Sequence, residues 1–166
     1  MNRRKWLWAA VLALPLAVTG GLVYANSQAR SYVCPVTGEE LLGGLGLPLG
    51  LASDGETLYV SDWLLGTVFA IGPDGEAVPL ASELSSPEGL ALDGDRLLVV
   101  EEGLDRVSAI DLSSGKVTPV VEGLDLGGRG IPHSLPYGAF NGVAVGPDGS
   151  IFVTEDVTNT VYEFAR

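Results

Sequence analysis

The sequence has little of several residue types on which cross-linking, metal binding and nucleic-acid binding depend. Its 166 residues include one cysteine, one histidine and one methionine, and 9 lysines and arginines stand against 21 aspartates and glutamates, a net charge of −12 at pH 7. A single cysteine, Cys34, excludes an internal disulfide and a zinc site built from several cysteines. The shortage of positive charge argues against nucleic acid as a partner, because phosphate binding needs a basic surface.

The few positive charges include a run at the N-terminus that precedes an apolar segment. Arg3, Arg4 and Lys5 are followed by an uncharged stretch from Trp6 to Ala25. This pattern is typical of a signal peptide, and the stretch is also long enough to span a bilayer as an uncleaved helix. We therefore expect residues 1–25 to be a signal peptide or an N-terminal membrane anchor, and residues 26–166 to be exported, periplasmic or extracellular. A membrane contact is expected only through residues 6–25, if they are not cleaved.

Glycine is abundant, with 23 residues, and turn signals recur along the chain at a regular spacing. The segment Gly50–Asp62 is similar to Gly89–Glu101, which begins 39 residues later, and to Gly142–Glu155. Each holds an Asp-Gly pair between β-rich runs, which is a strong hairpin signal. The strands expected next are Thr67–Ile71 with Glu76–Leu80, Arg106–Asp111 with Lys116–Val121, and Thr160–Phe164. The pattern predicts an all-β chain of four-stranded antiparallel units of about 40 residues, the size of a propeller blade.

The repeated unit, Pro-x-Gly-Leu-Ala-x-Asp-Gly followed by Leu-Tyr-Val-x-Asp, resembles the NHL-repeat and SMP-30/gluconolactonase-like β-propellers. The residues that carry the resemblance are Pro48–Ala52 with Leu58–Asp62, Pro87–Ala91, and Asn141–Ala144 with Pro147–Gly149. The resemblance implies a partial β-propeller of the six-bladed, TolB-like type, preceded by the N-terminal hydrophobic helix. We expect blades at about 45–86, 87–126 and 139–166, a half-blade at 31–44 and an insertion loop at 127–140.

Three blades do not close a propeller, since propellers typically have about four to eight. Three explanations stand at this point. The chain is a fragment of a longer propeller, two copies join head to tail and close a six-bladed ring as a homodimer, or the chain is an open or differently packed monomer.

The residue just before the innermost strand of each unit is a candidate metal ligand. These positions hold Leu49, Glu88 and Asn141. In the gluconolactonase-like family a Glu and an Asn at such places bind a divalent metal. The resemblance therefore implies that Glu88 and Asn141 bind calcium or another divalent cation, which prefers oxygen ligands. Leu49 cannot ligate, and the alternative is that Glu88 is an exposed turn acid and Asn141 a turn residue.

Three carboxylates recur just past the second strand of each unit: Asp62, Glu101 and Glu155. One hypothesis is that they form a ring of carboxylates at one face. The simpler interpretation is that each caps the backbone amides of a turn. Trp63 follows Asp62 in a loop, where an exposed aromatic would be a natural contact for a ligand.

The insertion between the second and third units holds the remaining candidates. Gly89 and Gly142 are 53 residues apart, against 39 for the preceding pair. The inserted segment contains the only histidine, His133, a candidate catalytic general base because its pKa is naturally near neutral. Arg129 is a candidate partner for a carboxylate or phosphate, and Tyr137 joins it and Trp63 as predicted ligand-binding residues. The alternative is a loop that packs over the channel mouth.

These features predict an exported propeller module that binds a protein, glycan or small-molecule ligand at one face. The first alternative is a calcium-dependent hydrolase or lactonase of the gluconolactonase type. The second is an inactive fragment of a longer propeller. The sequence leaves the choice between binding protein and enzyme open, because this fold carries many functions.

Overall fold

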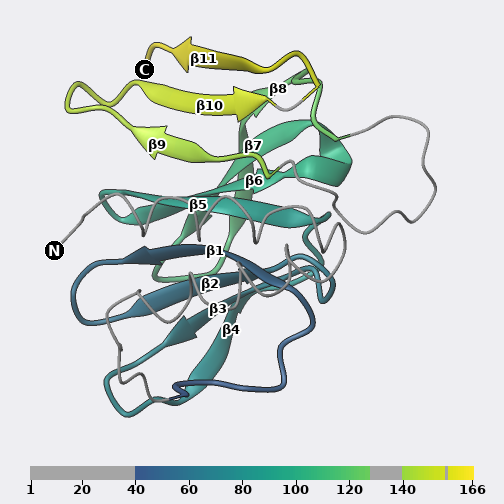
Figure 1. Ribbon diagram of the computed structural model, residues 1–166. Coiled ribbons are helices and arrows are strands. Elements are labelled where there is room, and N and C mark those ends of the chain that lie inside the picture. The colour runs from purple at the N-terminus through teal and green to yellow at the C-terminus, as the bar shows by residue number, and fades with distance from the viewer. Residues whose placement is uncertain (1–39, 128–139, 156) are drawn as a thin grey trace, which may run out of the picture. The chain divides into compact units, whose positions relative to one another are not determined.

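The computed structural model describes residues 40–127, 140–155 and 157–166 (Figure 1). The chain divides into two units at residues 40 and 41, and the sheets described below belong to the second, Leu41–Arg166. The hydrophobic N-terminal segment and most of the insertion loop lie outside the described residues, as does the half-blade apart from residues 40–44, which form no strand. Within the described ranges, no helix has the length and apolar character needed to cross a membrane.

The described part of the chain folds into three antiparallel sheets, which follow one another in sequence. Sheet 1 has the order β1 (Pro48–Ser53), β2 (Leu58–Asp62), β3 (Thr67–Ile71) and β4 (Ala77–Ala81). Sheet 2 has the order β5 (Pro87–Asp93), β6 (Arg96–Glu101), β7 (Arg106–Asp111) and β8 (Val117–Glu122), with a short 3-10 helix, η1 (Glu102–Leu104), between β6 and β7. Sheet 3 holds β9 (Val143–Val145), β10 (Ile151–Glu155) and β11 (Thr160–Phe164). The predicted all-β class is confirmed, and sheets 1 and 2 are the predicted four-stranded antiparallel units, whereas sheet 3 has three strands among the described residues.

Turns with a residue in the left-handed region connect the strands of each hairpin; the residue is glycine in most of them, Asp105 between β6 and β7, and Asn159 between β10 and β11. The turn from β5 to β6 is an example: Gly94 has φ of 64°, a value that a residue without Cβ adopts at little cost. Asp93 and Arg96 pair across this turn, so the Asp-Gly signal in the sequence marks the hairpin correctly.

The first strands of the three sheets lie side by side, β1 against β5 and β5 against β9 (Figure 1). Two apolar cores lie between the sheets. The core between sheets 1 and 2 includes Tyr59, Val68, Leu90, Leu97, Val99 and Ile110. The core between sheets 2 and 3 includes Leu98, Val100, Val107, Ala109, Ile151 and Val153. Consecutive residues of β6 alternate between the two cores, because successive side chains of a strand point to opposite faces.

Candidate functional site

Most of the described candidates from the sequence gather at one end of the sheets. The connecting segments between sheets enter β1, β5 and β9 at this end, and β2, β6 and β10 finish there, on the right in Figure 1. We call it the connector end. His133, Arg129 and Tyr137 lie outside the described residues, so their predicted roles stay predictions.

The two predicted metal ligands are in direct contact at the connector end. The backbone N–H of Asn141 donates to Oε2 of Glu88 at 2.8 Å, and the Asn141 side-chain Nδ2 donates to the same oxygen at 2.9 Å. Glu88 is 1% exposed, so it is not the exposed turn acid of the alternative interpretation, and Asn141 is 2% exposed. The adjacent strands bring them together, since the N–H of Gly89 donates to the carbonyl of Asn141 at 3.1 Å.

The Glu88–Asn141 pair offers oxygen donors, but the described residues do not complete a calcium site. Calcium takes about six to eight oxygen ligands. The third repeat position holds Leu49, which has no side-chain donor atom. Within the part of the chain that the structure describes, no three His, Cys, Asp or Glu side chains lie close enough together to hold a metal ion. The pair by itself therefore does not fit a complete calcium site.

Asp62, the first of the three recurring carboxylates, is fully buried. It binds backbone N–H groups of the segment before β1 and of the loop after β2. It accepts hydrogen bonds from Gly46 at 2.6 Å and Leu47 at 3.0 Å, which precede β1. It also accepts bonds from Leu64 at 3.1 Å and Leu65 at 3.0 Å, which follow β2. Burial raises the pKa of Asp62, but the hydrogen bonds outweigh it and hold the pKa below its ordinary value of 3.8.

Glu101 has the corresponding place in sheet 2 and is 1% exposed. It accepts the N–H of Ser85, in the segment that enters β5, at 3.1 Å. Its other oxygen accepts the Ser108 hydroxyl at 2.5 Å and forms an ion pair with Arg106 at 2.7 Å. These partners fix the carboxylate within the sheet.

Glu155 repeats the arrangement in sheet 3, where it is 4% exposed. It accepts the N–H of Asp125, which follows β8, at 2.7 Å, and the hydroxyl of Thr158. Asp62, Glu101 and Glu155 thus each bind backbone of the segment that arrives from outside their own sheet. Their geometry matches the simpler interpretation, in which the carboxylates cap backbone amides.

Trp63 is half-buried, and its ring nitrogen is hydrogen-bonded. The indole Nε1 donates to Oε2 of Glu102 in η1 at 2.8 Å. This bond joins the loop between β2 and β3 of sheet 1 to the loop between β6 and β7 of sheet 2. The polar edge of the indole is therefore engaged within the protein.

A group of exposed apolar side chains at the connector end is not among the sequence candidates. Its members lie in or beside the loops at this end and are 43–65% exposed: Leu64, Leu65, Leu104, Phe140 and Val157. The sequence signal that could have found them is the pair of adjacent leucines in a tight turn, where polar residues and glycine usually stand. We call these five side chains the apolar loop group.

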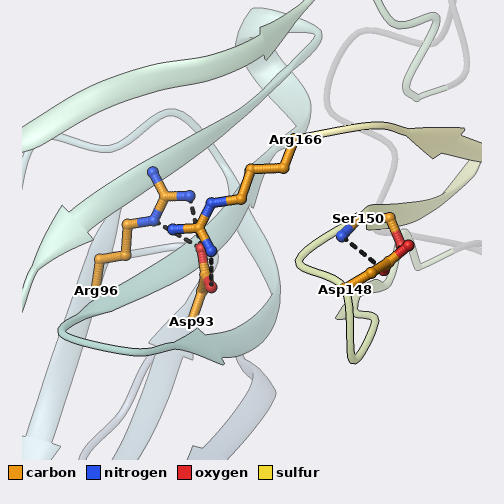
Figure 2. Close-up of polar contacts among 5 residues, drawn as sticks. All are labelled: Asp93, Arg96, Asp148, Ser150 and Arg166. Atoms are coloured by element: carbon orange, nitrogen blue, oxygen red, sulfur yellow. Dashed lines mark hydrogen bonds and ion pairs between the residues drawn. The ribbon is translucent and has the colours of Figure 1, made fainter.

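The opposite end of the sheets carries ion pairs between a buried carboxylate and two more exposed arginines (Figure 2). Asp93 at the end of β5 binds Arg96 at 2.6 Å and lies 3.8 Å from Arg166. In the turn between β9 and β10, Asp148 accepts the Ser150 hydroxyl at 2.6 Å.

Comparisons with known proteins identify the fold. No family model matches the chain, and no curated protein matches its sequence. Solved structures do match. A chain of a nidogen/laminin complex is 24% identical with a TM-score of 0.60, and the match covers 75% of this chain and 46% of that one. A gluconolactonase from Xanthomonas campestris is 21% identical with a TM-score of 0.55, over 72% of this chain and 38% of that one.

A third match, to a candidate gluconolactonase, is 17% identical with a TM-score of 0.53, over 77% of this chain and 51% of the other. The chain thus spans about half or less of the length of these solved structures. Likeness at this level of identity establishes the fold and not the activity. It confirms the resemblance to NHL-repeat and SMP-30/gluconolactonase-like propellers, and sheets 1, 2 and 3 are consecutive blades of a partial β-propeller.

Proposed function

We propose that this chain is an exported β-propeller module that binds a partner protein at the connector end. The observation that carries the proposal is the apolar loop group. Loops on a rigid scaffold commonly carry binding function, and apolar side chains that gather on a surface mark interaction sites. Export is supported by the charged and apolar pattern of residues 1–25.

The loops that present these side chains are held in place by buried groups. Leu64 and Leu65 are 65% and 51% exposed, while their backbone N–H groups are bound by Asp62. The next loop is tied to this one through Trp63 and Glu102. A surface fixed before binding loses less conformational entropy when a partner arrives, which favours affinity.

A protein is the partner class that this surface favours over a glycan or a small molecule. The apolar loop group is spread over loops from all three sheets: Leu64 lies after β2, Leu104 after β6 and Val157 after β10. Covering aliphatic side chains with other apolar groups lowers the free energy by roughly 25 cal/mol per Å² of buried surface. They offer no hydrogen bonds to sugar hydroxyls, and the charge of −12 opposes nucleic acid.

Selection from a random peptide display library on the full chain tests this proposal. The variant Leu64→Ser with Leu65→Ser removes apolar surface without opening a core, because both side chains are exposed. Val78→Ser is the matched control, since Val78 is 50% exposed on β4 and outside the apolar loop group. We expect wild type and control to enrich the same apolar peptides and the double variant to lose them. Equal enrichment by the double variant would reject this surface. Binding to a glycan array alone would assign a glycan instead.

A second candidate function, a calcium-dependent hydrolase of the gluconolactonase type, is favoured by the contact between Glu88 and Asn141. Calorimetric titration of calcium chloride into the full chain tests it. Glu88→Gln should abolish calcium binding, whereas Glu76→Gln, at an exposed turn, should not. Absence of calcium binding by the wild type would remove the hydrolase. If peptides and glycans also failed to bind, the inactive fragment would be the remaining alternative.

A further inference from the structure

Sheet 3 has one face packed against sheet 2 and a second face that is open among the described residues. The third strands of the sheets show the difference, because Val68, Val107 and Val161 have the same position in successive units. Val68 and Val107 are 0% exposed, and Val161 is 65% exposed. The face that the first two sheets bury against their successor is therefore uncovered in sheet 3. We call it the open face.

The contacts between sheets 1 and 2 and between sheets 2 and 3, which we call the two internal joints, show how such a face binds the next sheet. At each joint, a glycine near the start of the first strand lets a carbonyl of the next sheet approach closely. A Cβ added at Gly50 would clash with the carbonyl of Glu88, and one added at Gly89 would lie 2.6 Å from the carbonyl of Asn141. At the first joint the Ser61 hydroxyl accepts the N–H of Gly50 at 2.8 Å and donates to the Glu88 carbonyl at 2.5 Å.

The open face repeats the first joint's arrangement of glycine and hydroxyl. Gly142 donates its N–H to the hydroxyl of Thr154 at 2.6 Å, as Gly50 does to Ser61. A Cβ on Gly142 would meet only the Thr154 hydroxyl, at 3.4 Å, among the described atoms within 4 Å. Space for an incoming carbonyl and a hydroxyl to bind it are therefore present together on this face.

Sheet 1 carries the complementary face. Leu51 has the repeat position of Leu90, which is 8% exposed in the core between sheets 1 and 2, yet Leu51 itself is 65% exposed. Leu49 has the position of Glu88, whose carbonyl fills the first joint. On the same face, Val60 of β2 is only 4% exposed, so the uncovered part of this face lies along β1. The first strand of a sheet is also the strand through which consecutive sheets contact each other within the chain.

We propose that the open face of sheet 3 binds the β1 side of sheet 1 in a second copy of this chain. Thr154 then donates to the carbonyl of the partner's Leu49, as Ser61 does to Glu88, and Val161 is covered together with the partner's Leu51. Each copy supplies one of each face, so two copies join through two identical joints with twofold symmetry. Two copies of three sheets give six sheets, within the range of about four to eight blades at which propellers close.

One charged side chain on the open face limits the strength of this joint. Glu163 pairs with Phe152 across β10 and β11 and shares the face of Val161, whereas its counterpart in sheet 2, Ala109, is 3% exposed. A carboxylate covered without a partner costs free energy, and inward-pointing charges are a common protection against unspecific sheet association. Glu163→Ala should therefore tighten the dimer.

Sedimentation equilibrium of the full chain in a mild detergent tests the proposal. Wild type and Val78→Asp, the control with an exposed valine on β4, should dimerise equally. Val161→Asp and Leu51→Asp should each raise the dissociation constant at least about tenfold. Gly142→Ala should do the same with an unchanged thermal midpoint of the monomer, because its Cβ has room within the chain but would meet the incoming carbonyl.

Mixing the two aspartate variants identifies the pairing of faces. A mixed dimer of Val161→Asp and Leu51→Asp chains keeps one joint free of substitutions, so mixing should restore dimers that neither variant forms alone. A wild-type chain that stays monomeric at every concentration overturns the proposal. A dimer that loses affinity with Val161→Asp but not with Leu51→Asp also overturns it, because the open face would then bind itself.

Discussion

At the scale of single residues, the buried carboxylates hold the connector end together. Asp62 is 0% exposed and accepts four backbone N–H groups, from Gly46, Leu47, Leu64 and Leu65. Buried donors that lose their acceptor cost the full free energy of their desolvation. The carboxylate therefore orders the segment before β1 and the loop that carries the exposed leucines at the same time.

Replacing Asp62 by Asn should lower the free energy of unfolding by about 2 kcal/mol. The amide nitrogen would face the N–H of Gly46 with no acceptor between them, and the charge that strengthens the other bonds would be lost. Asp74→Asn is the control, since Asp74 is an exposed turn residue that accepts one N–H from Glu76. Urea unfolding should place the control within about 0.5 kcal/mol of wild type. Equal losses in both variants would contradict the role of Asp62.

The lowered pKa of Asp62 also predicts a pH dependence. Its pKa in the folded protein is below the ordinary value of 3.8, so its stabilising contribution is fully present above that value and decreases as the pH falls through it, because the unfolded chain takes up the proton first. The difference in unfolding free energy between wild type and Asp62→Asn should narrow below pH 3.8. Asp111, whose pKa the Ser113 and Ser114 hydroxyls lower to about 2, is present in both proteins and cancels in this difference.

A difference that stayed constant from neutral pH to pH 3.8 and below would assign the effect of the substitution to packing alone. Urea unfolding of both proteins across this range provides the measurement.

Residue roles were predictable from the sequence where a position recurs in each unit, and not where the contact joins residues far apart in the chain. The recurrence of Asp62, Glu101 and Glu155 favoured amide caps, and the structure places them so. The Gly46 and Leu47 donors to Asp62 lie 16 and 15 residues earlier in the chain, a separation at which spacing carries no information about contact. The contact between Glu88 and Asn141 was implied only by the family resemblance.

At the scale of elements, the first strands are the contact surfaces of the sheets, and glycine sets their separation. Gly89 in β5 faces the Asn141 carbonyl and the Cα of Gly142. The backbones of the two sheets are so close here that no room is left for a methyl group on Gly89. Neither obstacle is the end of a flexible side chain. The strands cannot accept a larger residue here without moving apart.

Gly89→Ala should therefore destabilise the protein by about 2 kcal/mol, as overpacking in a rigid core does. The added Cβ would lie 2.6 Å from the Asn141 carbonyl oxygen and 2.9 Å from the Gly142 Cα. Gly142→Ala is the control at the same repeat position, where the nearest described atom is 3.4 Å away. Urea unfolding in dilute, monomeric protein provides the measurement. Similar midpoints for the two variants would show that the joint is looser than the structure indicates.

Strand positions were predictable wherever alternation runs between two turn signals. The third strands β3, β7 and β11 have the bounds expected from the sequence. The strand β4 begins one residue later than predicted, because the N–H of Glu76 is bound by the Asp74 side chain and Glu76 belongs to the turn. Side chains of local turns shift strand ends in a way that hydrophobic alternation does not record.

At the scale of the whole molecule, the net charge and the repeated sheets have opposite effects on the proposed association of two copies. The net charge of −12 makes two copies repel, which opposes the dimer proposed through the open face and the β1 side of sheet 1. The all-β repeat was predictable because its period is regular, 39 residues between Gly50 and Gly89. The exposure of Val161, against the burial of Val68 and Val107, was not predictable, because exposure depends on the neighbouring sheet and not on the repeat itself.

Salt should strengthen the proposed dimer. Dissolved ions shorten the range of repulsion between like charges, from about 10 Å at 0.1 M to about 3 Å at 1 M. The apolar contacts of Val161 are not weakened by this screening. The dissociation constant from sedimentation should fall as sodium chloride is raised. A constant that rises with salt would mean that ion pairs, and not apolar contacts, hold the copies together.

The hydrogen bond between Trp63 and Glu102 has a consequence for how such a repeat diverges. These residues occupy one position in successive units, since they are 39 residues apart, like Gly50 and Gly89. Two tryptophans at this position would offer no acceptor and two glutamates no donor, so freshly duplicated units could not form the bond. It arises only once neighbouring copies differ, and in this chain the donor stands in the earlier copy. The two units are therefore no longer equivalent, because one supplies the donor and the other the acceptor of this bond.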